Sequence, residues 1–365
     1  MGSFLTHPVN TPPSPTRWHK RYHPLLQQWV VYAAHRNARP WSFDRARAPT
    51  PAPVLHDPTC YLCPGNARAG GQRNPDYDGP FAFDNDFPVV GPDAPAVAEA
   101  PGGVYRKAPA RGLARVLCYH PRHDASTATV AAGDVRAVFA ALRSETRELS
   151  RRPEVRSVFP FENKGQLVGV SNPHPHCQVY ATDFVFDSVA RGLSAAEAHA
   201  RERDGADLFG DILAAELADG APRVVAANAH AVAFVPYFAR WAYEVMIVPR
   251  APRATLASLS PAELDALADL YHEVARRYDG LFGEPFPYVL SVPQAPFREN
   301  GEEDATPGYR VHVWLQPPLR QPGLKKFPAG PEWGGGNFMA DTLPEDSAAQ
   351  LRAVQLPAAR LAPAS

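Results

Sequence analysis

The 365-residue chain has no long hydrophobic run, no excess of either charge and few cysteines. No apolar stretch approaches the roughly 18 residues that span a bilayer. The proline-rich start, 1–16, has no hydrophobic signal core, so we expect a cytoplasmic protein. The 37 basic and 38 acidic residues give a net charge of −1, which argues against bulk binding to nucleic acid or to an anionic membrane. Any anionic ligand is therefore expected at a local site.

The four cysteines predict a metal site more readily than disulfide bonds. In a chain of this length with no export signal, they do not form the disulfide framework of a small secreted protein. Cys60 and Cys63 have the CxxC spacing that lets two thiolates bind one tetrahedral ion. A redox pair is the alternative, but no thioredoxin-like pattern surrounds them and Pro64-Gly65 favours a tight turn. We favour zinc, with His123 and His174 as candidates for the other ligands.

A histidine pair, His174-Pro175-His176, separates two segments, Leu167–Val170 and Val179-Tyr180, that we expect to be extended. A period of two would place both rings on one side of a sheet, and Pro175 indicates an edge or the start of a strand. In most soluble proteins such a pair is solvated surface. Here it is surrounded by hydrogen-bond donors, namely Asn163, Lys164, Ser171, Asn172 and Gln178. These donors could bind phosphate oxygens around a neutral imidazole that attacks phosphorus.

The chain also contains an internal repeat. A hydrophobic strand, a Pro-Arg step and an amphipathic helix occur at 115–149 and again at 244–278. Asp134 is the predicted N-cap of the first helix, and Ser260 to Glu263 forms a capping box for the second. In the second half, His312-Val313-Trp314 takes the place of the histidine pair, so only the first half keeps two imidazoles.

Other elements follow from hydrophobic periodicity. Further strands are expected after each helix, at 155–170 and 179–180 in the first half and at 288–292 and 309–315 in the second. Between the halves, 194–217 is predicted to be one linker helix. A short helix and a disordered end are expected after Pro344.

At this point the motifs together resemble those of galactose-1-phosphate uridylyltransferases, of the histidine-triad-like superfamily. The likeness covers most of the chain, and the Ser-Asn-Pro-His-Pro-His-x-Gln string is its most specific part. The segments that carry it are 28–41, the CxxC knuckle, 74–77, 83–87, 161–165, 171–178 and 317–327.

The resemblance implies an α+β fold with two related histidine-triad-like domains, whose antiparallel sheets form a half-barrel with packed helices. Residues 1–192 would be the N-terminal catalytic domain, with the zinc site and the nucleophilic histidine. Residues 193–365 would be the C-terminal domain, which contributes contacts to the hexose phosphate. A homodimer is also implied, with no nucleic-acid or membrane partner.

The reaction that the resemblance implies is the transfer of UMP from UDP-glucose to galactose 1-phosphate in the Leloir pathway. His176 would attack the α-phosphorus, glucose 1-phosphate would leave, and galactose 1-phosphate would capture the uridylyl-histidine intermediate. Gln178 would hydrogen-bond the transferred phosphoryl oxygens. One structural zinc ion bound by His174 would stiffen the strand and leave His176 free to attack.

The resemblance also implies positions for the substrates. These are Asn163, Gly169 and Ser171 along the phosphate path; Asn85, Asp86 and Phe87 at uridine and ribose; Arg36 and Arg39, which match arginines that reach the nucleotide site across a dimer interface; and Lys326, Phe327 and Glu332 near the hexose phosphate.

The chain departs from the family pattern in two places. Some members carry a second, iron-type site built from a glutamate and three histidines, of which only His312 has a clear counterpart here. Pro293 and Trp314 occupy the matching positions, so this second site is predicted to be absent. Residues 332–337 replace a helical stretch and leave no clear partner for the family's sugar-binding glutamine, although Asn337 could substitute.

These departures leave two alternatives to the uridylyltransferase. One is a related nucleotidylyltransferase or phosphorylase that acts on another nucleotide sugar, such as ADP-glucose, with phosphate as acceptor. The other is a non-catalytic, zinc-stabilised nucleotide-binding protein. Retention of His174, His176 and Gln178 disfavours the second, because a binding protein needs no free imidazole among oxyanion donors.

Overall fold

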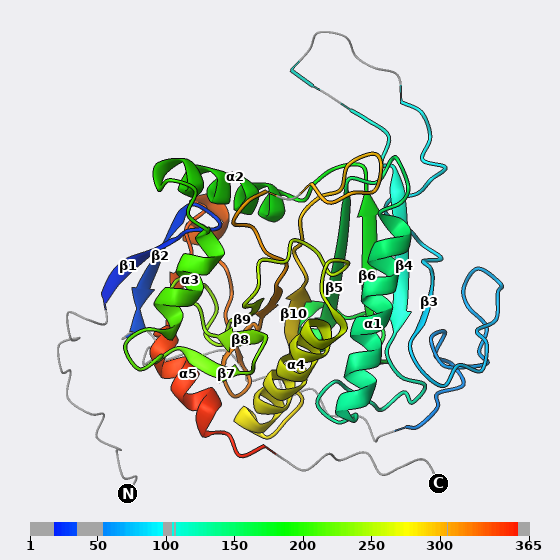
Figure 1. Ribbon diagram of the computed structural model, residues 1–365. Helices are drawn as coiled ribbons and strands as arrows, with labels where there is room; N and C mark the ends of the chain where they lie inside the picture. The colour runs from blue at the N-terminus through cyan, green and yellow to red at the C-terminus, as the bar shows by residue number, and fades with distance from the viewer. Residues whose placement is uncertain (1–17, 35–53, 98–103, 106, 305, 357–365) are drawn as a thin grey trace, which may run out of the picture.

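A computed structural model describes residues 18–34, 54–97, 104–105, 107–304 and 306–356 (Figure 1). Two predicted substrate-binding residues, Arg36 and Arg39, lie outside the described residues, as does the predicted disordered end beyond 356. Among the helices described, none is both long and apolar enough to cross a membrane.

One nine-stranded sheet forms the centre of the molecule, and all its neighbouring strands are antiparallel. Its strands, in spatial order, are β3 (Phe81–Asp84), β4 (Gly112–Cys118), β6 (His176–Thr182), β5 (Ser157–Lys164), β10 (Tyr288–Ser291), β11 (Val313–Gln316), β9 (Val245–Pro249), β8 (Ala231–Phe234) and β7 (Val224–Ala227). The two halves of the chain meet where β5 pairs with β10. The sheet, with its associated helices, fits the predicted α+β class.

The strand order is symmetrical about the β5–β10 pair, as the internal repeat requires. Outward from β5 come β6 and then β4, and outward from β10 come β11 and then β9 in the corresponding positions. The register agrees, because Cys118 pairs with His176 in the first half and Met246 pairs with Trp314 in the second. Trp314 therefore occupies the position in the second half that His176 occupies in the first.

Two long helices, α1 (Ala132–Leu149) and α4 (Pro261–Phe282), pack against each other on one face of the sheet (Figure 1). Their apolar faces share one core with alternate residues of the strands, including Cys177, Val179 and Ala181 of β6. Because successive strand residues point to opposite faces, His176, Gln178 and Tyr180 project from the other face of the sheet.

The second half of the sheet is also covered on that other face. Helices α2 (Asp187–Glu202) and α3 (Leu208–Leu217) contribute to a second core with β8, β9 and β11. Leu25 and Leu26, in the turn between β1 (Trp18–His23) and β2 (Gln28–Ala33), belong to the same core. Among the described residues, this second core covers the face in the second half of the sheet and not beside His176.

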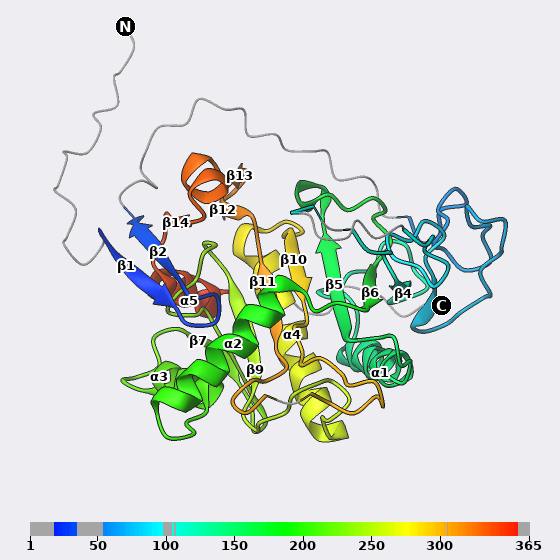
Figure 2. The ribbon, with the colours of Figure 1, turned by 90° about the horizontal axis from the view of Figure 1, so that it is seen from above.

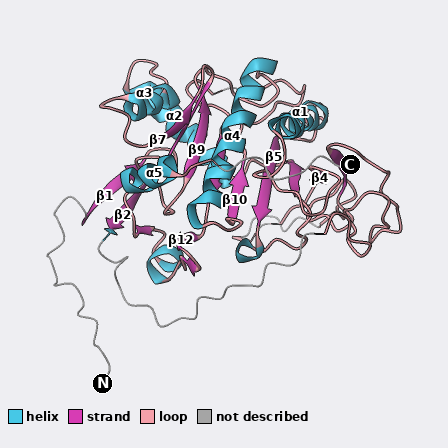
Figure 3. Cartoon of the chain, turned by 90° about the horizontal axis from the view of Figure 1, so that it is seen from below, coloured by secondary structure: helices cyan, strands magenta, loops and turns pink. Residues whose placement is uncertain are grey.

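Strands β1, β2 and β14 and helix α5 lie near the β7 end of the sheet (Figure 2). Strand β14 (Met339–Ala340) pairs with β2, and α5 (Pro344–Ala353) packs on β7 and α4. Strands β12 (Leu319–Gln321) and β13 (Leu324–Lys325) form a small antiparallel hairpin. At the opposite end, the segment before β3 consists mainly of loop (Figure 3).

Several local predictions need correction. Helix α1 begins at Ala132, and Asp134 is not its N-cap but lies in its first turn, where its carboxylate accepts a hydrogen bond from the Ala131 backbone. The expected extended run 167–170 contains a short 3₁₀ turn, Gln166–Val168, ended by Gly169 with φ of 81°. The predicted linker helix is two helices, α2 and α3, because Asp204 and Gly205 interrupt it with positive φ. The capping box at Ser260 and the helix after Pro344 are confirmed.

Candidate active site

Four predicted metal ligands lie together beside β4 and β6. The side-chain donor atoms of Cys60, Cys63, His123 and His174 are all within 4.8 Å of one another. The Nδ1 atoms of both histidines lie 3.5 Å from the Cys63 Sγ atom. Two thiolates and two imidazoles in this arrangement match the ligand set of a closed tetrahedral zinc site. The cluster could therefore hold a metal ion.

Neighbouring groups fix the orientation of these ligands. The His174 Nε2 atom lies 3.0 Å from both the His120 carbonyl oxygen and the Tyr77 hydroxyl, so its N–H faces these partners. The Nδ1 lone pair is then left for a metal. The Asn172 amide nitrogen lies 3.3 Å from the Cys60 sulfur, and its Oδ1 accepts the backbone N–H of His174. Such contacts from surrounding residues favour the thiolate and the metal-binding tautomer.

His176 begins β6 directly after this cluster. Its Nδ1 atom lies 2.7 Å from the His174 carbonyl oxygen and must carry the proton of that hydrogen bond. The Nε2 lone pair is therefore available to a ligand. Burial lowers the pKa of His176 below its usual value, which keeps the ring neutral at pH 7. A half-buried neutral imidazole with a free Nε2 atom is suited to nucleophilic attack.

Gln178 projects next to His176 on the same face. Its Oε1 atom accepts hydrogen bonds from the Tyr180 hydroxyl at 3.2 Å and from the Asn85 amide at 3.4 Å. The amide oxygen is thus occupied, while the Nε2 group has no partner among the described residues. Gln178 can therefore donate from its nitrogen to a negatively charged oxygen.

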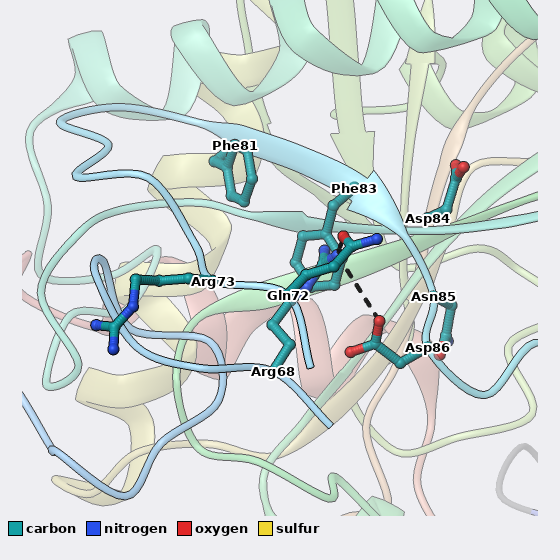
Figure 4. Close-up of a pocket in the computed structure, with 8 residues that line it drawn as sticks. All are labelled: Arg68, Gln72, Arg73, Phe81, Phe83, Asp84, Asn85 and Asp86. Carbon is teal, nitrogen blue, oxygen red and sulfur yellow. Dashed lines mark hydrogen bonds and ion pairs between the residues drawn. The ribbon is translucent and has the colours of Figure 1, made fainter. Parts of the chain in front are cut away.

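A pocket of about 360 Å³ opens beyond Asn85, at the end of β3. Figure 4 shows residues of the loop before β3 facing those at the end of β3 across the pocket. Asp86 lies 3.8 Å from the guanidinium of Arg68, which stacks over the Phe83 ring at 4.2 Å. Arg68 is only 9% exposed, and its buried Nε atom has no hydrogen-bond partner among the described residues. The lining combines aromatic rings with charged and amide groups, a set that suits a nucleoside.

Other predicted substrate residues lie around this site at different depths. Asn163 is on β5 and alternates to the same face as His176, while Ser171 is exposed and Gly169 ends the 3₁₀ turn. Phe87 is 77% exposed and its backbone N–H bonds the Asn85 side chain. The roles of these residues toward a substrate stay predictions.

The predicted hexose-phosphate residues form a separate cluster. Lys326 is buried and donates to the Glu332 carboxylate at 3.2 Å, while Phe327 is exposed. The neighbouring Lys325 donates to the Leu167 carbonyl oxygen at 2.7 Å, which ties β13 to the turn that ends at Gly169. Both charges of the Lys326–Glu332 pair are therefore engaged within the chain.

The equivalent position in the second half is closed. Trp314 is 4% exposed, and its indole N–H donates to the Glu244 carboxylate at 2.6 Å. The His23 ring, from the end of β1, packs 4.3 Å from Phe238 and 5.7 Å from Trp314. The N-terminal hairpin thus fills the space beside Trp314, and the equivalent space beside His176 is not filled by it.

Some residues of the site had no role assigned from the sequence. Tyr180 continues the alternation of His176 and Gln178, so strand periodicity could have identified it. Arg68 and Gln72 could not be found this way, because they reach the pocket through the conformation of an irregular loop. Tyr77 and Asn172 lay within recognised motifs, but their contacts to the metal ligands depend on three-dimensional packing.

Comparisons with known proteins cover nearly the whole chain. The N-terminal domain of the galactose-1-phosphate uridyl transferase family matches residues 13–185, and its C-terminal domain matches residues 193–361. A galactose-1-phosphate uridylyltransferase from Haemophilus influenzae is 35% identical, over 92% of this chain and 94% of its own length. The rat enzyme of that name is 36% identical, over 92% of this chain and 87% of its own length.

Solved structures agree with these sequence matches. A uridylyltransferase superimposes with a TM-score of 0.73 at 27% identity and covers 92% of this chain and 97% of its own. An ADP-glucose phosphorylase from Arabidopsis thaliana has the same TM-score of 0.73 at 18% identity, over 93% and 99% of the two chains, which is a likeness of fold.

Fold and site thus define a duplicated α+β protein in which His176 lies beside a Cys₂His₂ cluster. The chain belongs to the galactose-1-phosphate uridyl transferase family.

Proposed function

We propose that this enzyme transfers the uridylyl group of UDP-glucose to galactose 1-phosphate through a covalent intermediate on His176. The observation that carries the proposal is the geometry of His176. Its Nδ1 atom is held by the His174 carbonyl oxygen, and its neutral ring projects beside Gln178 and the pocket at Asn85. The family membership supports the same reaction.

The reaction is a double displacement at phosphorus. The Nε2 atom of His176 forms a bond to the α-phosphorus, and the bond from that phosphorus to the bridging oxygen breaks, so glucose 1-phosphate leaves with the electron pair. The proton on Nδ1 stays on the imidazole, and the His174 carbonyl stabilises the positive charge that develops. The phosphate oxygen of galactose 1-phosphate then attacks the same phosphorus and releases His176, giving UDP-galactose.

The residues around His176 bind and orient the substrate. The nitrogen of Gln178 donates to the transferred phosphoryl group, and Asn163, Gly169 and Ser171 line its path. Asn85, Asp86 and Phe87 contact uridine and ribose. Lys326, Phe327 and Glu332 act near the hexose phosphate, with Arg36 and Arg39 reaching the nucleotide across a dimer interface. One site therefore serves two similar sugar phosphates in turn.

Zinc is the proposed metal of the Cys₂His₂ cluster, because two thiolates with two imidazoles match its preferred ligands. Cys60, Cys63, His123 and His174 would hold the ion and would thereby join the segment of Cys60 and Cys63 to the residues directly before β6. The carbonyl oxygen that holds the His176 ring belongs to the ligand His174, so this cross-link fixes the nucleophile. Its role is structural.

We also propose that the chain is organised as a catalytic domain, 1–192, and a second domain, 193–365, and that two chains associate as a homodimer. Open access to His176 in the first half and closure of the equivalent position by Trp314 in the second support this division of labour.

The first test is chemical trapping of the intermediate. UDP-glucose labelled in the uridylyl group should leave label on the quenched wild-type protein, and galactose 1-phosphate should remove it as UDP-galactose. In His176→Gly, turnover should fall by at least roughly a thousandfold, because no other group replaces the nucleophile. Normal turnover in this variant, or absence of the adduct in the wild type, would contradict the proposal.

The same assay separates the alternative substrates. If the ADP-glucose phosphorylase reading were right, ADP-glucose with inorganic phosphate would turn over faster than UDP-glucose with galactose 1-phosphate. The uridylyltransferase relatives support the opposite order. Nucleotide binding without any exchange would instead indicate a binding protein.

A further inference from the structure

We propose that Tyr180 is a positioning residue for the transfer, which holds the Gln178 amide with its nitrogen turned toward the transferred phosphoryl group. This inference rests on the proposed function. It concerns a hydroxyl group that does not itself contact the reacting atoms.

The direction of the Gln178 amide is set by donors on its oxygen. The Tyr180 hydroxyl donates to Oε1 at 3.2 Å, and the Asn85 amide donates to it at 3.4 Å. Asn85 has its own orientation fixed, because its Oδ1 accepts the backbone N–H of Phe87 at 2.9 Å. A reversed Gln178 amide would place its N–H₂ group against the Asn85 N–H₂ group, with two donors facing each other. The observed direction is therefore strongly favoured.

Tyr180 is itself rigid. It lies two residues after Gln178 on β6, where both side chains project from the same face. Its ring packs edge-on against Phe161, with centroids 4.8 Å apart and planes at 86°. Phe161 is the direct β5 partner of Gln178 in the ladder, so ring and amide are held by the same pair of strands. Because the ring is already held, the hydroxyl bonds to Oε1 with little further loss of side-chain conformational entropy.

This arrangement matters for the rate because Gln178 donates only from its nitrogen. With one of the two donors on Oε1 removed, the amide more often samples orientations in which its carbonyl oxygen faces the phosphoryl group and repels it. A donor held in place before reaction avoids that reorganisation as negative charge develops. Tyr180 should therefore affect the chemical step and not substrate binding.

The test is a double-mutant cycle followed by quenched-flow measurement of adduct formation from labelled UDP-glucose. Tyr180→Phe removes only the hydroxyl and should slow uridylylation roughly fivefold to tenfold, with KM for UDP-glucose unchanged. In a Gln178→Ala background the same change should have no further effect, since Tyr180 acts through that amide. Tyr243→Phe is the matched control, because it removes another tyrosine–glutamine hydrogen bond, to Gln350 at 2.8 Å, far from the site.

Three outcomes would overturn the inference. Tyr180→Phe could react at the wild-type rate, or it could slow the reaction equally with and without the Gln178 amide, as a general structural defect would. The same loss in Tyr243→Phe would also indicate a nonspecific effect. An absence of adduct in the wild type would overturn the proposed function and this inference with it. An adduct that forms equally fast in the wild type and in Tyr180→Phe would overturn only the inference.

Discussion

Single hydrogen bonds decide which atom of each site residue is available for chemistry. The carbonyl oxygen of His174 accepts a hydrogen bond from the Nδ1–H group of His176. The His174 ring presents its own Nδ1 atom to Cys63, because its Nε2 atom is engaged elsewhere. Asn172 contacts both a thiol and the backbone of a ligand. The orientation of the nucleophile and the proposed metal site are thus linked through one short segment.

Loss of the Asn172 side chain should weaken metal binding. In Asn172→Ala the Cys60 sulfur loses a donor and His174 loses the acceptor of its backbone N–H, so zinc affinity should fall by about 10- to 100-fold. Competition with a chromophoric chelator measures this. Asn228→Ala is the control, because Asn228 likewise accepts a backbone N–H two residues on, at His230, but contacts no cysteine. Equal affinities in wild type and Asn172→Ala would refute the expectation.

At the scale of the elements, the start of β4 depends on a glycine. Gly112 has φ of 151°, and a Cβ atom there would lie 2.2 Å from the Ala181 carbonyl oxygen of β6. Gly112→Ala should therefore lower the free energy of unfolding by about 3 kcal/mol or more, since backbone must move. At Gly133, in α1, a Cβ atom would meet nothing within 4 Å beyond its chain neighbours and the backbone of its own helix, and Gly133→Ala should raise stability by about 0.5 to 1 kcal/mol. Urea unfolding of both variants checks the contrast.

Hydrophobic periodicity predicted the long helices and most strands, and the CxxC spacing with two candidate histidines predicted the metal cluster. Features that depend on strand register and on loop conformation were missed. The apolar faces of α1 and α4 and the capping box at Ser260 follow local rules, so these helices could be located. The run 167–170 looked extended because it is apolar, yet Leu167 is 37% exposed and the segment turns at Gly169. The link between Gln178 and Asn85 arises only when β3, β4 and β6 align, which no local pattern encodes.

For the molecule as a whole, buried neutral histidines make stability depend on pH. Burial lowers the pKa of His312 to about 4 and that of His23 well below its usual 6.5. Well above pH 6.5 both rings are neutral in the folded and in the unfolded chain, so their protonation does not change the free energy of unfolding. As the pH falls from 6.5 toward 4, the unfolded chain binds protons that the folded chain excludes, so stability is lost.

Each such ring should contribute up to about 1.4 kcal/mol per pH unit over this range. Urea unfolding at pH 7.5, 6 and 5 should show the decline. His312→Asn should make the decline shallower whatever its effect at pH 7.5, and a slope identical to that of the wild type would show that His312 does not titrate as expected.

The two repeats are joined into one sheet by the hydrogen-bonded pairing of β5 with β10. In either repeat by itself, β5 or β10 would be an unpaired edge strand with backbone groups that face water. One repeat alone would need a second copy to pair with this edge, and in this chain the other repeat supplies it. Because Trp314 holds the register position of His176, the described residues of the second repeat present an indole there in place of an imidazole, although the strand order of the two repeats is the same.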